Sequence, residues 1–216
     1  MKALICLNGD RPEKKLVVQC ASECETVICA DGALQYLLDA NISPDLWLGD
    51  MDSVSPKKLS EAKARGIIPK TYPMQKDYTD GQLAVKEAIA SGADELLLLG
   101  ALGGRSDHLL ENMRLLYDAC RMGVRAVACS ERERVFLSGD IAEFSKQNGA
   151  LVSMLPYTDT VTVSRTEGLR YPLTDYTFSR EEFFAISGVS NVLTEQRGRY
   201  ILSSGYGLFV QIKQNE

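Results

Sequence analysis

Residues 95–108 read ELLLLGALGGRSDH, an apolar run followed by a turn that is rich in glycine. Residues 96–99 are all leucine, and a strand that is apolar on both faces is typical of the buried centre of a parallel sheet. Glycines directly after a strand let backbone N–H groups approach an anion, and the dipole of a following helix favours that anion. The turn matches neither the Walker-type phosphate loop nor the dinucleotide-binding fingerprint, so a simple strand-to-helix connection is an equally good interpretation.

The first 130 residues alternate short apolar runs with longer segments of helical character. Ser55 and Pro56 are typical of a helix start, and Gly66 is typical of the residue that follows a helix end. This alternation predicts a parallel sheet with helices on its faces, a Rossmann-like α/β domain over residues 1–130. The expected strands are residues 3–7, 26–30, 46–48, 67–68, 95–99 and 125–129.

The pattern changes after about residue 130, where strand-like runs follow one another at short intervals. Clusters of Gly, Asn, Asp and Ser separate these runs, and only residues 179–184 have the character of a short helical turn. The pattern predicts a small antiparallel β-sandwich-like domain over residues 131–216. The expected strands are residues 134–137, 143–144, 151–155, 160–163, 183–186, 189–193, 200–202 and 208–212.

Composition excludes several classes of function. The 216 residues carry 29 acidic and 24 basic side chains, and this surplus argues against a nucleic-acid partner held by bulk electrostatics. The single histidine, His108, excludes zinc sites with two or more His ligands. No apolar run approaches the roughly 20 residues that a membrane span requires, so we expect no membrane partner. The six cysteines lie mostly in apolar runs without a CxxC pair, which predicts buried thiols and a cytoplasmic location.

Aspartates follow four of the expected strands. Any one of them is most often a helix cap or a turn residue. Because the carboxyl ends of parallel strands meet at one edge of a sheet, however, the joint pattern predicts a shared site there. The residues are Asp31 after the second strand, Asp50 and Asp52 after the third, Asp77 and Asp80 after the fourth, and Asp107 after the fifth.

Asp50 and Asp52 are the most specific part of this pattern. In extended backbone, residues two apart point the same way, so both carboxylates are expected to face one spot. At ~4 Å they would repel by roughly 1 kcal/mol in water and ~4 kcal/mol near a partly buried surface. A divalent cation would remove that penalty, and Mg²⁺ favours one or two carboxylates plus phosphate oxygens. With Arg105 as a fork for phosphate, the pattern favours phosphoryl-type transfer from a nucleotide, which needs no catalytic histidine.

Several motifs, in order over residues 3–207, resemble the thiamine pyrophosphokinases of the bacterial type. The resemblance implies an α/β nucleotide-binding catalytic domain followed by a β-sandwich-like thiamine-binding domain. It implies transfer of a pyrophosphoryl group from ATP to the hydroxyethyl group of thiamine, giving thiamine diphosphate and AMP, in a homodimer with thiamine at the subunit interface. The motifs are Asp31-Gly32, Pro44-Asp45, Gly49-Asp50-Met51-Asp52-Ser53, Pro73 with Lys76-Asp77 and Thr79-Asp80, residues 99–108, Gly168-Leu169, Tyr171-Pro172-Leu173 and Ser190-Asn191.

The same resemblance implies a role for each matched residue. Mg²⁺ would be held by Asp50, Asp52 and Asp80, while Asp77 and Asp107 would support the metal–phosphate cluster or the attacking hydroxyl. ATP would be contacted by Lys76, Thr79, Gly100, Gly103, Gly104, Arg105 and His108. Thiamine, with its cationic thiazolium, would be faced by Asp31, Gln75, Ser190 and Asn191, with Tyr171 or Tyr176 lining the pocket.

The chain departs from the family pattern at three positions. A second glycine is usual where Ala33 stands, an acid is usual where Gln82 stands, and Gly81 is unusual beside it. Two other functions stay open. Residues 46–52 resemble part of the strand and Asp-x-Asp signature of the haloacid-dehalogenase-type phosphatases, in which Asp50 would be the nucleophile. A non-catalytic nucleotide- or thiamine-binding module would need the same pocket without a full metal cluster.

Overall fold

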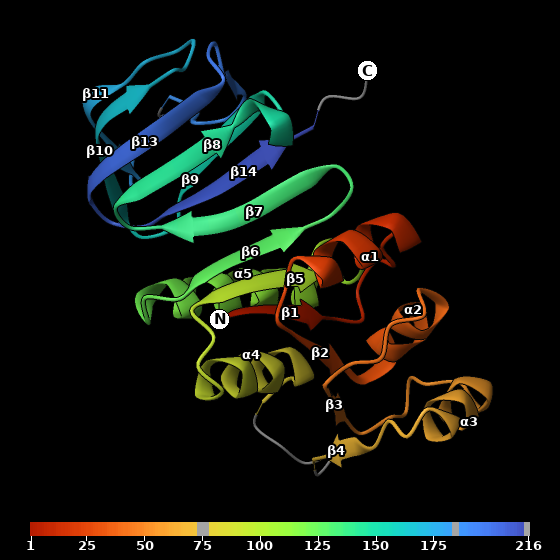
Figure 1. Ribbon diagram of the computed structural model, residues 1–216. Helices are drawn as coiled ribbons and strands as arrows, with labels where there is room; N and C mark the ends of the chain where they lie inside the picture. The colour runs from red at the N-terminus through yellow and green to blue at the C-terminus, as the bar shows by residue number, and fades with distance from the viewer. Residues whose placement is uncertain (73–77, 183–185, 214–216) are drawn as a thin grey trace. The chain divides into compact units, whose positions relative to one another are not determined.

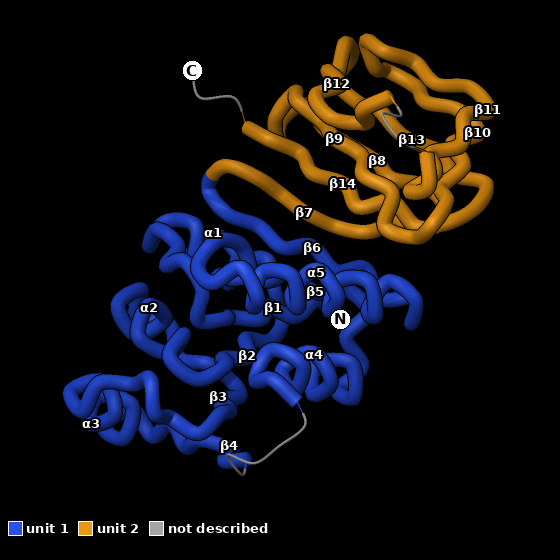
Figure 2. Tube along the Cα trace, turned by 180° about the vertical axis from the view of Figure 1, so that it is seen from behind, with its two compact units in different colours: residues 1–131 blue, residues 132–216 orange. Residues whose placement is uncertain are grey.

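The computed structural model describes residues 1–72, 78–182 and 186–213. The chain divides into two compact units, residues 1–131 and residues 132–216 (Figure 2). Within the described residues, no helix is long and apolar enough to cross a membrane.

Unit 1 contains a parallel sheet of six strands in the order β6-β5-β1-β2-β3-β4 (Figure 1). Every neighbouring pair is parallel, so all six carboxyl ends lie at one edge. The leucine run forms β5 next to β1, as a strand buried on both faces should. The strands are β1 Lys2–Cys6, β2 Thr26–Ala30, β3 Leu46–Gly49, β4 Pro69–Thr71, β5 Glu95–Leu99 and β6 Arg125–Cys129.

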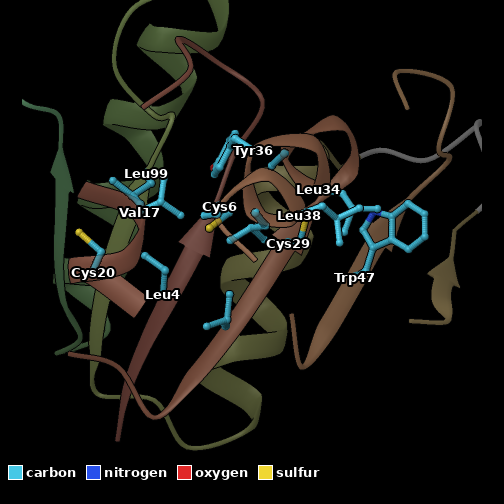
Figure 3. Close-up of a cluster of buried hydrophobic side chains, with 14 of the residues drawn as sticks. Leu4, Cys6, Val17, Cys20, Cys29, Leu34, Tyr36, Leu38, Trp47 and Leu99 are labelled. Atoms are coloured by element: carbon cyan, nitrogen blue, oxygen red, sulfur yellow. The ribbon is translucent and has the colours of Figure 1, made fainter. Parts of the chain in front are cut away.

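In the part of unit 1 that the structure describes, five helices and one short 3₁₀ turn connect these strands. Buried residues of α1 and α2 form one core with Leu4, Cys6 and Cys29 from the sheet (Figure 3). Side chains alternate along a strand, so Ala3 and Ile5 point to the opposite face, where α4 packs across β1, β2 and β3 and against α5. The helices are α1 Lys14–Ser22, α2 Leu34–Asp39, α3 Pro56–Ala64, α4 Asp80–Ala90 and α5 Ser106–Arg121, and the turn is η1 Asp31–Ala33.

The start and end of α3 follow the predicted signals, whereas the strand after it does not. Ser55 is the N-cap, Pro56 is the first helical residue, and Gly66 has a φ of 72° just after the helix end. The strand predicted at residues 67–68 is wrong, because β4 begins at Pro69. Its position at the edge of the sheet tolerates a residue that has no N–H to donate.

Among its described residues, unit 2 contains the antiparallel strands β12-β9-β14-β7 of one sheet and a second, four-stranded antiparallel sheet β11-β10-β13-β8. Both sheets contribute to one aromatic core, in which the ring of Phe209 lies 5.8 Å from Phe144 and 5.4 Å from Tyr200. This is a sandwich, so the predicted fold class is confirmed for both halves of the chain. The strands are β7 Glu133–Ser138, β8 Ile141–Ser145, β9 Leu151–Pro156, β10 Thr160–Glu167, β11 Thr174–Ser179, β12 Asn191–Val192, β13 Arg197–Ser204 and β14 Gly207–Ile212, with a 3₁₀ turn η2 at Lys146–Asn148.

Strand β11 is the element that sequence reasoning missed. Only Tyr176 and Phe178 alternate inward, while Thr177 on the outer face pairs its hydroxyl with Thr162 of β10 at 2.9 Å. Its apolar pattern is therefore too short to stand out. Ser179, predicted to begin a helical turn, instead ends this strand, and most of the strand predicted at residues 183–186 lies outside the described residues.

Candidate active site

The strand order places a topological switch point in unit 1 between β1 and β5. The chain builds β2, β3 and β4 on one side of β1 and then β5 and β6 on the other. In open α/β sheets, ligands bind at such a point, outside the carboxyl ends of the strands. There the segment after β1 meets the glycine turn after β5, since Gly9 N–H donates to the carbonyl of Gly100 at 3.0 Å.

Asp31 lies at this edge, at the end of β2, in an unusual environment. Its φ of 45° is in the left-handed region, and the indole N–H of Trp47 donates to its carbonyl at 3.1 Å. The carboxyl group is buried, and Oδ1 has no hydrogen-bond partner. Burial raises the pKa of Asp31, and the charges of Asp80 and Asp52 raise it further, against the lowering effect of hydrogen bonds.

Asp50 and Asp52 converge with Asp31. One carboxylate oxygen of each of the three residues lies within 4.8 Å of the others. The prediction of extended backbone here is wrong: Met51 has a φ of 67°, and Asp52 N–H donates to Oδ1 of Asp50 at 3.3 Å. The carboxylates therefore meet through a tight turn after β3. Asp31, expected on the sequence to face thiamine, lies in this carboxylate cluster.

Gly49 allows this convergence. Its φ is 135°, and a Cβ added there would lie 3.0 Å from Cβ and 3.2 Å from Cα of Asp31. A side chain at residue 49 would therefore push the end of β3 away from Asp31 and open the cluster. The close approach of two backbones is the reason for glycine here.

Asp80 reaches the same edge from the start of α4. It is the first residue of that helix, and its charge is one cause of the raised pKa of Asp31. Thr79 is the N-cap, with Oγ1 accepting from Gln82 N–H at 3.1 Å, while Thr79 N–H donates to Oε1 of Gln82 at 2.8 Å. This capping box fixes where the helix, and therefore Asp80, begins. The hydroxyl predicted to contact ATP is engaged as this cap.

The turn after β5 has the backbone that its glycines predict. Gly100, Gly103 and Gly104 have φ values of 66°, 76° and 71°. A Cβ at Gly100 would lie 2.1 Å from the carbonyl oxygen of Leu7, and one at Gly103 would lie 2.0 Å from a carboxylate oxygen of Asp10. No other residue type would let this turn pack against the segment after β1.

Arg105 and Asp107 form an exposed pair beside this turn. The guanidinium donates from Nε to one carboxylate oxygen at 3.1 Å and from an Nη to the other at 2.6 Å. The Arg105 side chain holds the pKa of Asp107 below its usual value, and His108 N–H also donates to that carboxylate at 3.0 Å. Asp107 thus engages the arginine fork that was predicted for phosphate, and the side chain of His108 is exposed.

Sequence reasoning missed two sets of residues at this edge. Asn8 and Asp10 lie directly after β1, and their side chains lie against Gly32 and Gly103 respectively. The signal was an Asn-Gly pair just after an apolar run, a common turn dipeptide. Asn112 of α5 donates to the carbonyl of Ala101 at 2.8 Å and so holds the glycine turn; its place on a polar helix face offered no such signal. The predicted Gln75, Lys76 and Asp77 lie outside the described residues.

Ser190 and Asn191, the other predicted thiamine residues, lie in unit 2. Asn191 is buried, and its Oδ1 accepts from the N–H groups of Tyr171 and Val192, at 3.0 and 2.9 Å. Its amide donates to the carbonyl of Tyr171 at 2.8 Å and to the hydroxyl of Tyr200 at 3.3 Å. The side chain therefore holds the backbone of Tyr171, whose side chain is 60% exposed. Ser190 is exposed, with a φ of 65°.

The carboxylate cluster fits a hard divalent cation. All its donors are oxygen atoms, and the buried Asp31 Oδ1 is left without the hydrogen bond that a buried acceptor normally has. A cation bound through that atom would supply its missing partner, and a cation among the three carboxylates would offset their mutual repulsion. The site is thus consistent with metal use.

Fold and site together define a class of protein. It combines an α/β unit, in which an acidic metal-fitting cluster and a glycine-rich turn share the carboxyl edge, with a separate β-sandwich unit. The sequence model for the thiamin pyrophosphokinase catalytic domain matches residues 17–128, and the model for the thiamin pyrophosphokinase vitamin B1 binding domain matches residues 142–204. The first match alone spans more than half of the chain, which therefore belongs to the thiamin pyrophosphokinase family.

Individual relatives agree with this assignment. Thiamine pyrophosphokinase of Bacillus subtilis (strain 168) is 26% identical over 186 residues, which are 85% of this chain and 86% of that protein. Thiamine pyrophosphokinase 1 of Oryza sativa subsp. japonica is 26% identical over 200 residues, 80% and 73% of the two chains. The crystal structure of thiamine pyrophosphokinase from Bacillus subtilis has the same fold, with a TM-score of 0.86 at 23% identity and full coverage of both chains.

Family membership decides among the functions that the sequence left open. The chain is an enzyme, a kinase-type transferase with a catalytic domain and a thiamine-binding domain. It is not assigned to the phosphatases, in which Asp50 would be a nucleophile, or to the non-catalytic binding modules. Its substrates are thiamine and a nucleotide.

Proposed function

We propose that the enzyme transfers the terminal pyrophosphoryl group of ATP to thiamine, with a metal held at the carboxyl edge of unit 1. The hydroxyethyl oxygen of thiamine attacks the β-phosphorus, the bond from that phosphorus to the α,β-bridging oxygen breaks, and AMP leaves while the hydroxyl proton is lost. The observation that carries this proposal is the carboxylate cluster: one oxygen each of Asp31, Asp50 and Asp52 lie within 4.8 Å of one another, and Asp31 has a buried oxygen without a hydrogen-bond partner. Residues 1–130 form the catalytic domain and residues 131–216 the thiamine domain in this account.

Asp31, Asp50 and Asp52 hold Mg²⁺ in this proposal, and Asp80 completes the set. When bound, Mg²⁺ supplies positive charge that offsets the charge of the phosphate oxygens. Support comes from the oxygen-only donor set and from the charge of Asp80, which acts on the pKa of Asp31. Placing Asp31 among the metal ligands changes the role first expected for it.

Phosphate binding falls to the turn after β5. The N–H groups of residues 100–104 and the start of α5 face the polyphosphate, because glycines at positive φ leave the backbone open to an anion. Arg105 exchanges its carboxylate partner, Asp107, for phosphate, and both ligands suit its planar fork. Lys76, Thr79 and His108 contribute further ATP contacts, and Asp77 and Asp107 support the cluster or the attacking hydroxyl.

Thiamine binding involves Ser190, Gln75 and the segment that Asn191 holds. The exposed ring of Tyr171 offers a π face to the thiazolium cation, and Asn191 fixes the backbone beneath it. We place this site at the interface of a homodimer. We place the enzyme in the cytoplasm, which agrees with thiols such as Cys6, whose burial raises its pKa to about 12 and keeps it unreactive.

Product analysis tests this function. The purified enzyme is incubated with ATP, MgCl₂ and thiamine, and nucleotides and thiamine esters are separated by chromatography. We expect AMP and thiamine diphosphate in equal amounts, and formation of ADP with thiamine monophosphate would contradict the proposal. Asp52→Asn should abolish turnover without unfolding the chain, whereas Asp118→Asn, a matched change in an exposed α5 pair with Arg114, should not.

A further inference from the structure

Gln82 lies in the first turn of α4, and its side chain makes two hydrogen bonds. Oε1 accepts from the N-cap Thr79 N–H at 2.8 Å, and Nε2 donates to Oε1 of Glu111 in α5 at 2.7 Å. Gln82 therefore closes the start of α4 and ties it to α5. Only an amide can make both bonds at once, since a carboxylate would still accept the first but could not donate the second.

Gly81 lets the two helices come close enough for the hydrogen bond between Gln82 and Glu111. A Cβ at this position would lie 3.3 Å from a methyl of Leu115 in α5 and 3.5 Å from a methyl of Leu7 after β1. The start of α4 thus packs tightly against α5 and the end of β1. Gly81 and Gln82 therefore both hold the start of α4 against α5.

The hydrogen bond between Gln82 and Glu111 connects the carboxylate side of the active site with the glycine turn. On the α4 side, Asp80 is the first residue of the helix and precedes Gly81, which packs against Leu7 just after β1, at the carboxyl edge of the sheet. On the α5 side, Asn112 follows Glu111 and donates to the Ala101 carbonyl at 2.8 Å. Consecutive residues of α5 therefore hold the start of α4 and the glycine turn.

We propose that Gln82 is a positioning residue, which acts through Asp80 and fixes that carboxylate relative to the glycine turn. This inference rests on the proposed function, because it assigns Asp80 to the metal and the turn to phosphate. Gln82 and Glu111 act as a complementary pair: the donor on α4 requires an acceptor on α5. An acid at residue 82 is compatible with this geometry only if residue 111 becomes the donor.

A swap of the pair tests the proposal. Gln82→Glu places two carboxylates next to each other in place of a hydrogen bond of 2.7 Å, and it keeps the hydrogen bond with Thr79 N–H. Glu111→Gln alone keeps the bond, since the new amide oxygen still accepts. The double variant Gln82→Glu, Glu111→Gln restores the bond with donor and acceptor exchanged.

Four quantities are measured for wild type and the three variants: kcat, the KM for thiamine, the Mg²⁺ concentration for half-maximal rate, and Mn²⁺ affinity by electron paramagnetic resonance. For Gln82→Glu we expect kcat to fall about tenfold and the Mg²⁺ concentration for half-maximal rate to rise about tenfold. The KM for thiamine should stay unchanged. Glu111→Gln should stay within about twofold of wild type, and the double variant should recover most of the loss.

Three results would overturn the proposal. They are near-wild-type constants for Gln82→Glu, a double variant no better than that single variant, and a loss explained entirely by unfolding as followed by Trp47 fluorescence. Failure of the proposed function looks different. It would show as wrong products from the wild type, while the Mn²⁺ affinities of the four proteins would still report whether Gln82 positions Asp80.

Discussion

Replacing Asp31 by Asn should stabilise the metal-free enzyme and remove most of its response to Mg²⁺. Asn keeps the shape of the side chain and tolerates the φ of 45°, so the backbone is not strained. At 4.8 Å, two unit charges repel by about 3.5 kcal/mol at an effective dielectric constant of about 20 and about 0.9 kcal/mol in water. Since Asp52 is exposed, we expect a gain of about 1–3 kcal/mol in the free energy of unfolding.

The pH dependence of this gain follows from the direction of the pKa shift. Burial raises the pKa of Asp31 in the folded state above its ordinary value of 3.8. The stability that Asp31 contributes is therefore full below that ordinary pKa and is lost as the pH rises through the folded-state pKa. The advantage of Asn over Asp should accordingly be full near neutral pH and shrink as the pH falls toward about 4.

Trp47 provides the assay, because it is the single tryptophan of the chain and its indole N–H donates to Asp31 itself. Urea unfolding is followed by its fluorescence, with EDTA and then with saturating Mg²⁺, for wild type, Asp31→Asn and the matched control Asp118→Asn. Mg²⁺ at 100 times its Kd should stabilise the wild type by about 2.7 kcal/mol and Asp31→Asn by much less. An Asn variant that is less stable in EDTA, or equally stabilised by Mg²⁺, would refute the reasoning.

Three further predictions concern single residues. Arg105→Ala should raise the KM for ATP about tenfold and leave the KM for thiamine unchanged, and equal effects on both substrates would argue against a phosphate contact that replaces Asp107. Gly49→Ala should lower the free energy of unfolding by about 1–3 kcal/mol and weaken Mg²⁺ binding, because its Cβ would lie 3.0 Å from Asp31; unchanged Mg²⁺ affinity in calorimetry would contradict this. Asn191→Ala should raise the KM for thiamine but not the KM for ATP in steady-state kinetics. A raised KM for ATP with an unchanged KM for thiamine would contradict this prediction.

Much of the fold was predictable from local pattern. The strands Thr26–Ala30, Glu95–Leu99 and Arg125–Cys129 have the predicted bounds, because buried parallel strands are apolar on both faces and end abruptly at polar turns. Their parallel arrangement also explains why aspartates far apart in the sequence gather at one edge. The edge strand β4 and the half-polar β11 were missed or misplaced, since neither has a buried face long enough to mark it.

The geometry of the site was less predictable. Asp50 and Asp52 meet because Met51 adopts a left-handed conformation and Gly49 packs on Asp31, and both facts depend on a neighbouring strand rather than on the local sequence. For the same reason, sequence motifs alone placed Asp31 with thiamine.

Crystals grown with Mn²⁺ and a non-hydrolysable ATP analogue would test the central claim most directly. We predict an anomalous difference peak within bonding distance of carboxylate oxygens of Asp31, Asp50 and Asp52, with the polyphosphate against residues 100–104. A metal bound elsewhere, with the oxygen Oδ1 of Asp31 still unpartnered, would contradict the account.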